Sequence, residues 1–169
     1  FLHLGNSARL VLVPAGDDLN AVRGCEAGPC NSVLDALTTR LTGGRESFDA
    51  GGKYAVQGRC FEQLAQQWLA HSFFARRPPK CLSPALFAND FASQALEQGK
   101  LLNATLHDLL CTATHFVVRG IAGAIVKYFP RMQRTANIYL SGGGIRNGLL
   151  WRLLEQQLKE FSIQRTDLL

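Results

Sequence analysis

Three consecutive glycines are the feature of this sequence most typical of a ligand-binding turn. Gly142-Gly143-Gly144 follows the apolar segment 137–140, which predicts a buried strand, and precedes a predicted helix from about 146 to 159. Glycines let a ligand approach the backbone closely, and the N–H groups of a helix N-terminus favour negative charge. Because three glycines are costly in chain entropy for a simple connection, we predict a functional turn here. A tight strand-to-helix connection is the alternative.

A second turn of small residues lies near the start of the chain. Residues 2–13 alternate around Gly5-Asn6-Ser7, which predicts a β-hairpin because Gly and Asn tolerate a positive φ. Consecutive backbone N–H groups in such a turn can form an anion-binding nest. The alternative is an ordinary hairpin turn, which these residues on their own favour.

Polar residues near other predicted loops are candidates for binding a sugar or Mg²⁺. Glu26 is expected at the end of a short third strand, 21–26, where a carboxylate beside the Gly28-Pro29 loop could take either ligand. Asn31 lies where a helix through about residue 41 is expected to begin. Lys80 lies on a later loop, and a merely solvated side chain is the alternative for it.

Several classes of site are absent from the sequence. It contains neither GxGxxG nor a Walker lysine motif, and its four histidines show no metal-ligand spacing. No Ser/His/Asp or Cys/His arrangement can be assigned. The five cysteines are an odd number without a CxxC pair, which disfavours a disulfide scaffold and a zinc site. Reduced cysteines in a cytoplasmic protein are therefore expected.

Composition and charge place the chain among ordinary globular proteins. Hydrophobic residues make up 47% and charged residues 18%. The net charge is +5, but the basic residues are scattered and the densest cluster, 76–80, lacks regularly spaced aromatic residues, so nucleic acid is not an expected partner. Glycine and charged residues interrupt the apolar segment 116–129, and no signal-peptide pattern opens the chain, so membrane association is not expected.

The order of predicted elements indicates an α/β fold, with helices packed on a mixed sheet. The expected strands and helices are, in order, the hairpin 2–13, strand 21–26, helices 31–41, 51–74, 86–96 and 104–128, strand 137–140, helix 146–159 and strand 161–166. Both ends look cut from a longer chain. Residues 1–169 are therefore expected to form a single lobe of a larger protein.

Six short segments, in this order, resemble the anhydro-N-acetylmuramic acid kinases of the actin-like superfamily. The segments are 3–9 (HLGNSAR), 25–31 (CEAGPCN), Asp49 with Gly52, Ala55 and Gly58, 78–80 (PPK), 104–106 (ATL) with Thr112-Ala113, and 142–147 (GGGIRN). Each motif is weak, but six in one order over nearly the whole chain are fairly specific.

The resemblance implies one lobe of an actin-like ATPase, a ribonuclease H-like fold, within a two-lobe kinase. ATP with Mg²⁺ would bind between the lobes, with its phosphates near Gly5, Asn6 and Ser7. Its adenosine would lie near Gly142-Gly143-Gly144 and Asn147, the latter on the first turn of the following helix. Glu26, Gly28, Asn31 and Lys80 would be associated with substrate or Mg²⁺. The family phosphorylates O6 of 1,6-anhydro-N-acetylmuramic acid as water opens the anhydro ring, which serves peptidoglycan recycling in the cytoplasm. The resemblance leaves a homodimer open.

The chain also departs from the family pattern. Glu26 replaces Asp, Cys30 replaces Gly, and residues 81–85 (CLSPA) replace S-T-G-R-E. The family's G-T-S-x-D-G phosphate loop and catalytic Asp lie upstream of the matched segments, so no catalytic residue is assigned here and the isolated chain is expected to be inactive. Two alternatives follow. One is a non-catalytic or divergent actin-like module that binds nucleotide or sugar, and the other is another enzyme of the superfamily, such as an activator-type ATPase.

Overall fold

The computed structural model describes residues 1–16, 18–129 and 136–166, and within these ranges the chain forms one mixed sheet. The five strands lie in the order β3-β2-β1-β4-β5. They are β1 (Leu2–Leu4), β2 (Ser7–Leu12), β3 (Arg23–Pro29), β4 (Asn137–Ser141) and β5 (Ser162–Arg165). β2 runs antiparallel to β1 and β3, whereas β4 runs parallel to both β1 and β5. The predicted α/β class and the predicted pairing of the hairpin with strand 137–140 in one sheet are confirmed.

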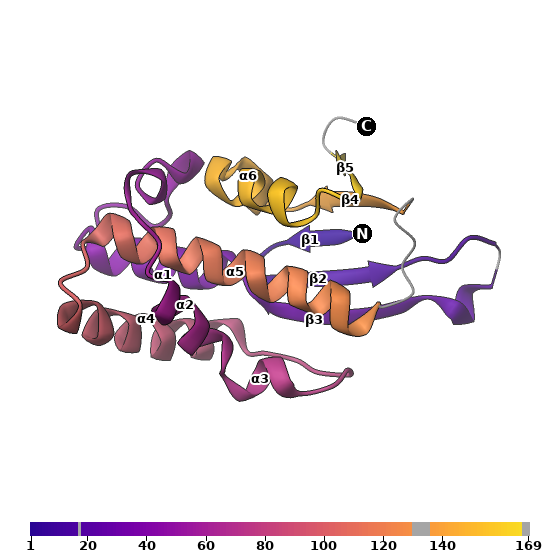
Figure 1. Ribbon diagram of the computed structural model, residues 1–169, viewed down its shortest axis with the longest axis horizontal. Coiled ribbons are helices and arrows are strands. Elements are labelled where there is room, and N and C mark those ends of the chain that lie inside the picture. The colour runs from indigo at the N-terminus through magenta and orange to yellow at the C-terminus, as the bar shows by residue number, and fades with distance from the viewer. Residues whose placement is uncertain (17, 130–135, 167–169) are drawn as a thin grey trace.

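Helices make up most of the chain between β3 and β4 (Figure 1). The α-helices are α1 (Asn31–Leu41), α2 (Glu62–Leu69), α3 (Ser72–Ala75), α4 (Pro84–Leu101), α5 (Leu106–Tyr128) and α6 (Gly148–Gln157). Short 3-10 turns are η1 (Leu19–Ala21), η2 (Ala50–Gly52), η3 (Ala55–Gln57) and η4 (Gly143–Arg146). The segment 51–74, predicted as one helical stretch, is divided into η2, η3, α2 and α3, because Gly51 and Gly52 have a positive φ and Gly58 and His71 have non-helical backbone.

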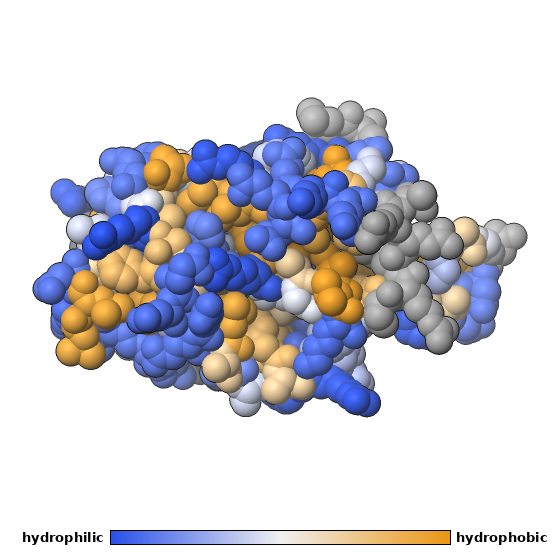
Figure 2. Space-filling model, in the orientation of Figure 1, coloured by the Kyte–Doolittle hydropathy of each residue, from blue (hydrophilic) through white to orange (hydrophobic). Residues whose placement is uncertain are grey.

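The sheet buries one face against this helical layer. Leu2, Leu4, Leu10 and Leu140 are buried, whereas His3, at the alternate position of β1, is exposed. This alternation follows from the period of two along a strand. The buried side chains join those of α1, α5 and α6 in one hydrophobic core. In space-filling form the viewed face shows apolar patches between polar residues (Figure 2).

Helix α5 is the central element of the helical layer and packs against α1, α2, α6 and β3. Its N-terminus is fixed by a capping box, in which the Thr105 side chain accepts from the Asp108 N–H and Asp108 accepts from the Thr105 N–H. By length and composition α5 could cross a membrane, but 72% of its most apolar window is buried inside the protein, as in the core helix of a globular fold.

Three predicted boundaries differ from the structure in ways that affect the site. Ser7 is not a turn residue but begins β2. β3 continues through Gly28 and Pro29, which were predicted as a loop, so Glu26 lies inside a strand. Because β3 is an edge strand, its last residue can be Pro without losing a ladder hydrogen bond. The predicted helix 146–159 begins instead at Gly148, with Asn147 as its N-cap.

Candidate functional site

The ends of β1, β3 and β4 meet at one edge of the sheet and bring part of the predicted site together. We call this group the turn cluster: Gly5, Asn6, Asn31, Gly142, Gly143, Gly144 and Asn147. β1 pairs in parallel with β4, so Leu4 and Gly142 leave the sheet side by side. Asn31 links the strand ends, because its Nδ2 donates to the Leu4 carbonyl at 3.2 Å.

The hairpin turn contacts the start of α1 through its carbonyl groups. The Gly5 oxygen accepts from the Asn31 N–H at 3.0 Å, and the Asn6 oxygen accepts from the N–H groups of Cys30 at 2.9 Å and Ser32 at 3.3 Å. The Ser32 hydroxyl also donates to the Asn6 oxygen at 2.8 Å. These N–H groups are the usual anion donors of a helix N-terminus. The carbonyl groups of the hairpin therefore already accept from the free N–H groups at the start of α1. An anion near Gly5 would have to bind other hydrogen-bond donors.

Gly142 and Gly144 are required by the backbone around them. Gly142 has φ 90° and ψ 169°, a conformation that is essentially restricted to glycine. A Cβ there would also lie 2.6 Å from the Leu4 oxygen. A Cβ on Gly144 would lie 2.7 Å from the Leu4 Cβ and 3.1 Å from Asn31 Oδ1. These two glycines allow the turn to pack tightly against β1 and α1.

Gly143 has no comparable structural constraint. It is exposed, it is not among the positive-φ glycines, and a Cβ there would meet only Asn31 Nδ2, at an ordinary distance of 3.7 Å. The positive φ of this turn belongs to Gly142. The backbone of Gly143 is instead exposed beside Asn31, at the ends of the strands, where a ligand could contact it.

Asn147 has a capping role. Its Oδ1 accepts from the Leu150 N–H at 3.1 Å, which satisfies one of the free donors at the start of α6. A Cβ on Gly52, where φ is 76°, would lie 2.6 Å from the same oxygen. The prediction placed Asn147 on the first turn of the helix, where its side chain would be available. At the N-cap this side chain is already engaged with the backbone and packed against η2.

The remaining predicted residues form a different group, which we call the edge cluster: Ser7, Glu26, Gly28 and Lys80, beside strand β3. Glu26 is 9% exposed and both of its oxygens are engaged. Oε1 accepts from the Ser7 hydroxyl at 2.9 Å and lies 3.5 Å from Arg9 Nε, and Oε2 accepts from the Leu82 N–H at 2.6 Å. Glu26 therefore joins the sheet edge to the loop that follows Lys80.

Gly28 and Lys80 pack against aromatic rings. A Cβ on Gly28 would lie 3.0 Å from Phe74 Cε1, so a larger residue would displace that ring. Lys80 Nζ donates to the Phe73 oxygen at 3.1 Å and lies 4.0 Å from the centre of the Phe73 ring and 5.0 Å from that of Tyr128. Burial lowers the pKa of Lys80. These contacts account for both residues without a ligand.

Glu26 could bind a Mg²⁺ ion only in competition with its present partners. Mg²⁺ is usually held by one or two carboxylates together with phosphate oxygens and water, and the Glu26 oxygens already contact Ser7, Arg9 and Leu82. Within the described ranges no three His, Cys, Asp or Glu side chains are grouped so that they could hold a metal ion. A nucleoside fits better, because the open backbone at Gly143 leaves room for a flat group.

Asp35, which the sequence did not single out, lies on α1 one helical turn after Asn31. Burial raises the pKa of its carboxyl to about 6. Among the residues that the structure describes, Asp35 forms no ion pair that would offset this burial. A half-buried acid so close to Asn31 is the main electrostatic feature that sequence patterns missed, because α1 gives no signal there beyond a single Asp in an amphipathic helix.

Comparison with known proteins identifies relatives over nearly the whole chain. The sequence model of the anhydro-N-acetylmuramic acid kinases matches residues 2–169. The enzyme of that name from Trichormus variabilis is 32% identical over 167 residues, 98% of this chain and 42% of the relative. The one from Salinibacter ruber is 30% identical over 166 residues, 98% of this chain and 41% of the relative. The chain thus spans less than half the length of these relatives.

A solved structure shares the fold. The activator of the 2-hydroxyisocaproyl-CoA dehydratase from Clostridium difficile, with bound ADPNP, matches with a TM-score of 0.58 at 13% identity, over 98% of this chain and 53% of that chain. This likeness confirms the predicted actin-like lobe. The family match over residues 2–169 shows that the chain belongs to the anhydro-N-acetylmuramic acid kinase family.

Proposed function

We propose that this chain supplies the adenosine-contacting surface of an ATP-dependent kinase that phosphorylates O6 of 1,6-anhydro-N-acetylmuramic acid as the anhydro ring opens. Membership of the family supports the kinase and its sugar. The activator of the same fold carries ADPNP, which supports an adenine nucleotide as the phosphate donor. Peptidoglycan recycling in the cytoplasm is the corresponding physiological role.

The observation that carries the proposal is the contrast among the three glycines. Gly142 and Gly144 are fixed by contacts with Leu4 and Asn31, whereas Gly143 is exposed and free of close neighbours. A turn that only joined β4 to α6 would not need glycine at position 143. Clearance for a ligand explains the third glycine, since a side chain there would occupy space beside Asn31.

In this arrangement the three glycines, Asn31 and Asn147 have defined tasks. Gly142 and Gly144 hold the turn against β1, and Asn147 fixes the start of α6. Gly143 would provide the surface on which adenosine rests, with the Asn31 side chain beside it. When bound, ATP would supply the transferred γ-phosphate, and Mg²⁺ would be held by groups other than Glu26. Phosphoryl transfer depends mainly on positioning, and this chain would contribute the positioning of the nucleoside.

The test is nucleotide titration of the full-length protein with Gly143→Val, against a matched control, Gly123→Val. Gly123 lies on α5 and, like Gly143, is exposed and has no atom closer than an ordinary van der Waals distance to its Cβ position. We expect Gly143→Val to weaken ATP binding about tenfold, equivalent to about 1.4 kcal/mol, while Gly123→Val leaves it unchanged. Circular dichroism checks that both variants are folded. If folded Gly143→Val binds ATP as tightly as the wild type, the turn is purely structural and the assignment fails.

A further inference from the structure

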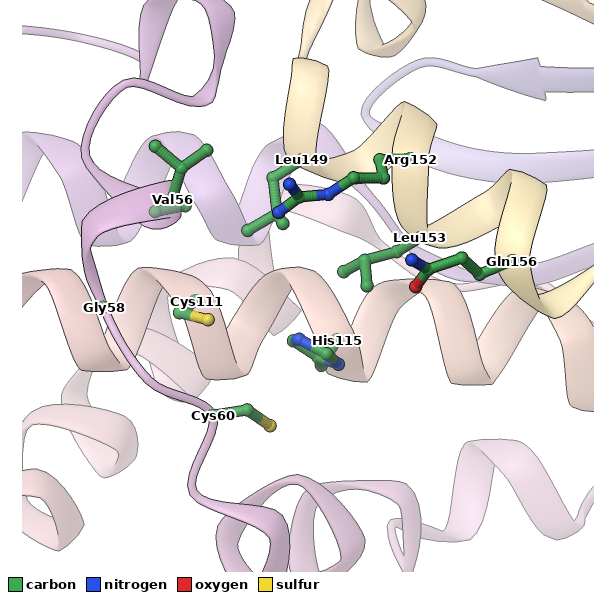
Figure 3. Close-up of a pocket in the computed structure, with 10 residues that line it drawn as sticks. Val56, Gly58, Cys60, Cys111, His115, Leu149, Arg152, Leu153 and Gln156 are labelled. Carbon is green, nitrogen blue, oxygen red and sulfur yellow. The ribbon is translucent and has the colours of Figure 1, made fainter.

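A groove lies on the helical layer, between α5, α6 and the segment 55–60 (Figure 3). Its volume is about 290 Å³. Ala55, Leu149 and Leu153 supply buried apolar lining, and Val56, 51% exposed, forms part of the rim. This volume is close to the lower end of the range for small-molecule sites. The groove shares no lining residue with the turn cluster or the edge cluster.

One wall of the groove is held rigidly on α5. The Arg59 N–H donates to Asp108 Oδ1 at 2.8 Å, and the Phe61 N–H donates to Thr112 Oγ1 at 3.0 Å. Gly58 lies so close to the His107 backbone that a side chain could not be accommodated. Residues 58–61 are therefore held against α5, and the groove stays open between this segment and α6.

The groove carries a cation without a counter-charge. The Arg152 side chain reaches across the groove from α6 (Figure 3), and among the described residues it makes no ion pair or hydrogen bond. Arg119, one turn beyond His115 on α5, is different, because both of its terminal nitrogens bind Glu62, at 2.6 and 2.7 Å. The Glu62 carboxylate is thus already neutralised by Arg119, and Arg152 is available to an anion.

Neutral polar groups complete the lining beside Arg152. Burial, then the charges of Arg119 and Arg152, lower the pKa of His115 despite the opposing effect of Glu62. Its ring is therefore neutral at pH 7 and offers one donor and one acceptor. Burial also raises the pKa values of Cys60, to about 12, and of Cys111. Both thiols stay protonated and add no negative charge to the groove.

We propose that this groove is a second ligand site, which takes a small organic anion with an apolar body. The carboxylate or phosphate head group would pair with Arg152 and accept hydrogen bonds from Gln156 and His115. The apolar body would pack on Leu149, Leu153 and Val56. An uncharged apolar molecule would leave Arg152 without a partner, and an inorganic ion would leave the exposed side chain of Val56 uncovered, so the lining favours a ligand with both parts.

The experiment is NMR titration of the full chain at pH 7, following the imidazole signals of His115, assigned with His115→Gln. The probes are benzoate, phenyl phosphate, benzamide and inorganic phosphate. We expect saturable shifts of the His115 signals with benzoate or phenyl phosphate, and at least tenfold weaker binding of benzamide and inorganic phosphate. Arg152→Gln should weaken the aromatic anion about tenfold. Arg40→Gln, an exposed Arg at the end of α1, is the matched control and should have no effect.

Each other outcome overturns the proposal. Equal binding of benzoate and benzamide would show an apolar groove that does not recognise charge. Equal binding of inorganic phosphate and phenyl phosphate would show an ion site without an organic ligand. No shift of the His115 signals at 20 mM probe, on the order of the weakest fragment affinities, would show that the groove binds nothing of this class. Arg152 is exposed, so Arg152→Gln is expected to fold, and circular dichroism verifies it.

Discussion

The turn cluster, made of Gly and Asn residues, and the edge cluster, which includes charged side chains, differ in how much of their surface is free to contact a ligand. In the edge cluster, Glu26, Ser7 and Lys80 satisfy one another, nearby backbone groups or aromatic rings. In the turn cluster the contacts are mostly made by backbone, and they leave Gly143 exposed. A polar side chain whose hydrogen bonds are complete stabilises the fold, whereas an open surface held by rigid neighbours can receive a ligand. The second arrangement is therefore the better candidate for the nucleotide.

The largest expected effect tests the contrast between Gly142 and Gly143 inside the turn cluster. Gly142→Ala should lower the free energy of unfolding by about 3 kcal/mol, because its φ of 90° disfavours any side chain and the new Cβ would meet the Leu4 oxygen. Gly143→Ala should change it by less than about 0.5 kcal/mol, as is usual at an open surface position. Urea denaturation measures both. Equal losses for the two variants would remove the distinction between structural and open glycines.

The next prediction concerns the edge cluster alone. Glu26→Gln should cost about 2 kcal/mol, since it removes charge-assisted hydrogen bonds and turns an amide N–H₂ toward the Ser7 hydroxyl or the Leu82 N–H. ATP affinity of the full-length protein should stay within about twofold, well under the 1.4 kcal/mol of a tenfold change. Glu97→Gln on the exposed face of α4 serves as the control and should be nearly neutral. A large loss of affinity without loss of stability would instead place Glu26 in the ligand site.

The smallest expected effect concerns Asp35, which lies on α1 one turn after Asn31 of the turn cluster. Asp35 has a pKa raised by burial to about 6, above the value near 3.9 expected in the unfolded chain. Between these values the native state binds more protons than the unfolded state, so the free energy of unfolding falls as pH rises from about 4 to about 6. Asp35→Asn should remove this fall and stabilise the protein at pH 7 by about 1 kcal/mol, allowing for solvent screening of the half-exposed side chain.

Denaturation at pH 4 and pH 7 tests this prediction, with Asp90→Asn on the exposed face of α4 as the matched variant. The Asp35→Asn gain should be present at pH 7 and absent at pH 4, whereas Asp90→Asn should show no such difference. A gain of equal size at both pH values would mean that ionisation of Asp35 is not its cause.

Local patterns predicted the elements well, because alternation and turn chemistry act over a few residues. They placed the hairpin, the strand before the glycines and the order of elements in an actin-like lobe. They did not show that the absence of a side chain at Gly28 leaves room for the Phe74 ring. Nor did they show that the Glu26 carboxylate accepts hydrogen bonds from Ser7 and Leu82. Those facts depend on residues distant in sequence. The α5–α6 groove also depends on residues distant in sequence. Its only local sequence pattern is the four-residue spacing of Cys111 with His115 and of Arg152 with Gln156.

The parallel pairing of β1 with β4 also has a consequence for how the protein is made. Leu2 pairs with Leu140, so the first strand cannot complete its hydrogen bonds until most of the chain has been synthesised. Until then β1 is an unpaired edge with apolar side chains at both ends, of the kind that promotes aggregation. The turn cluster closes only when β4 docks. The proposed nucleotide site would thus form late on the folding pathway, and nucleotide bound there would report that the whole lobe has folded.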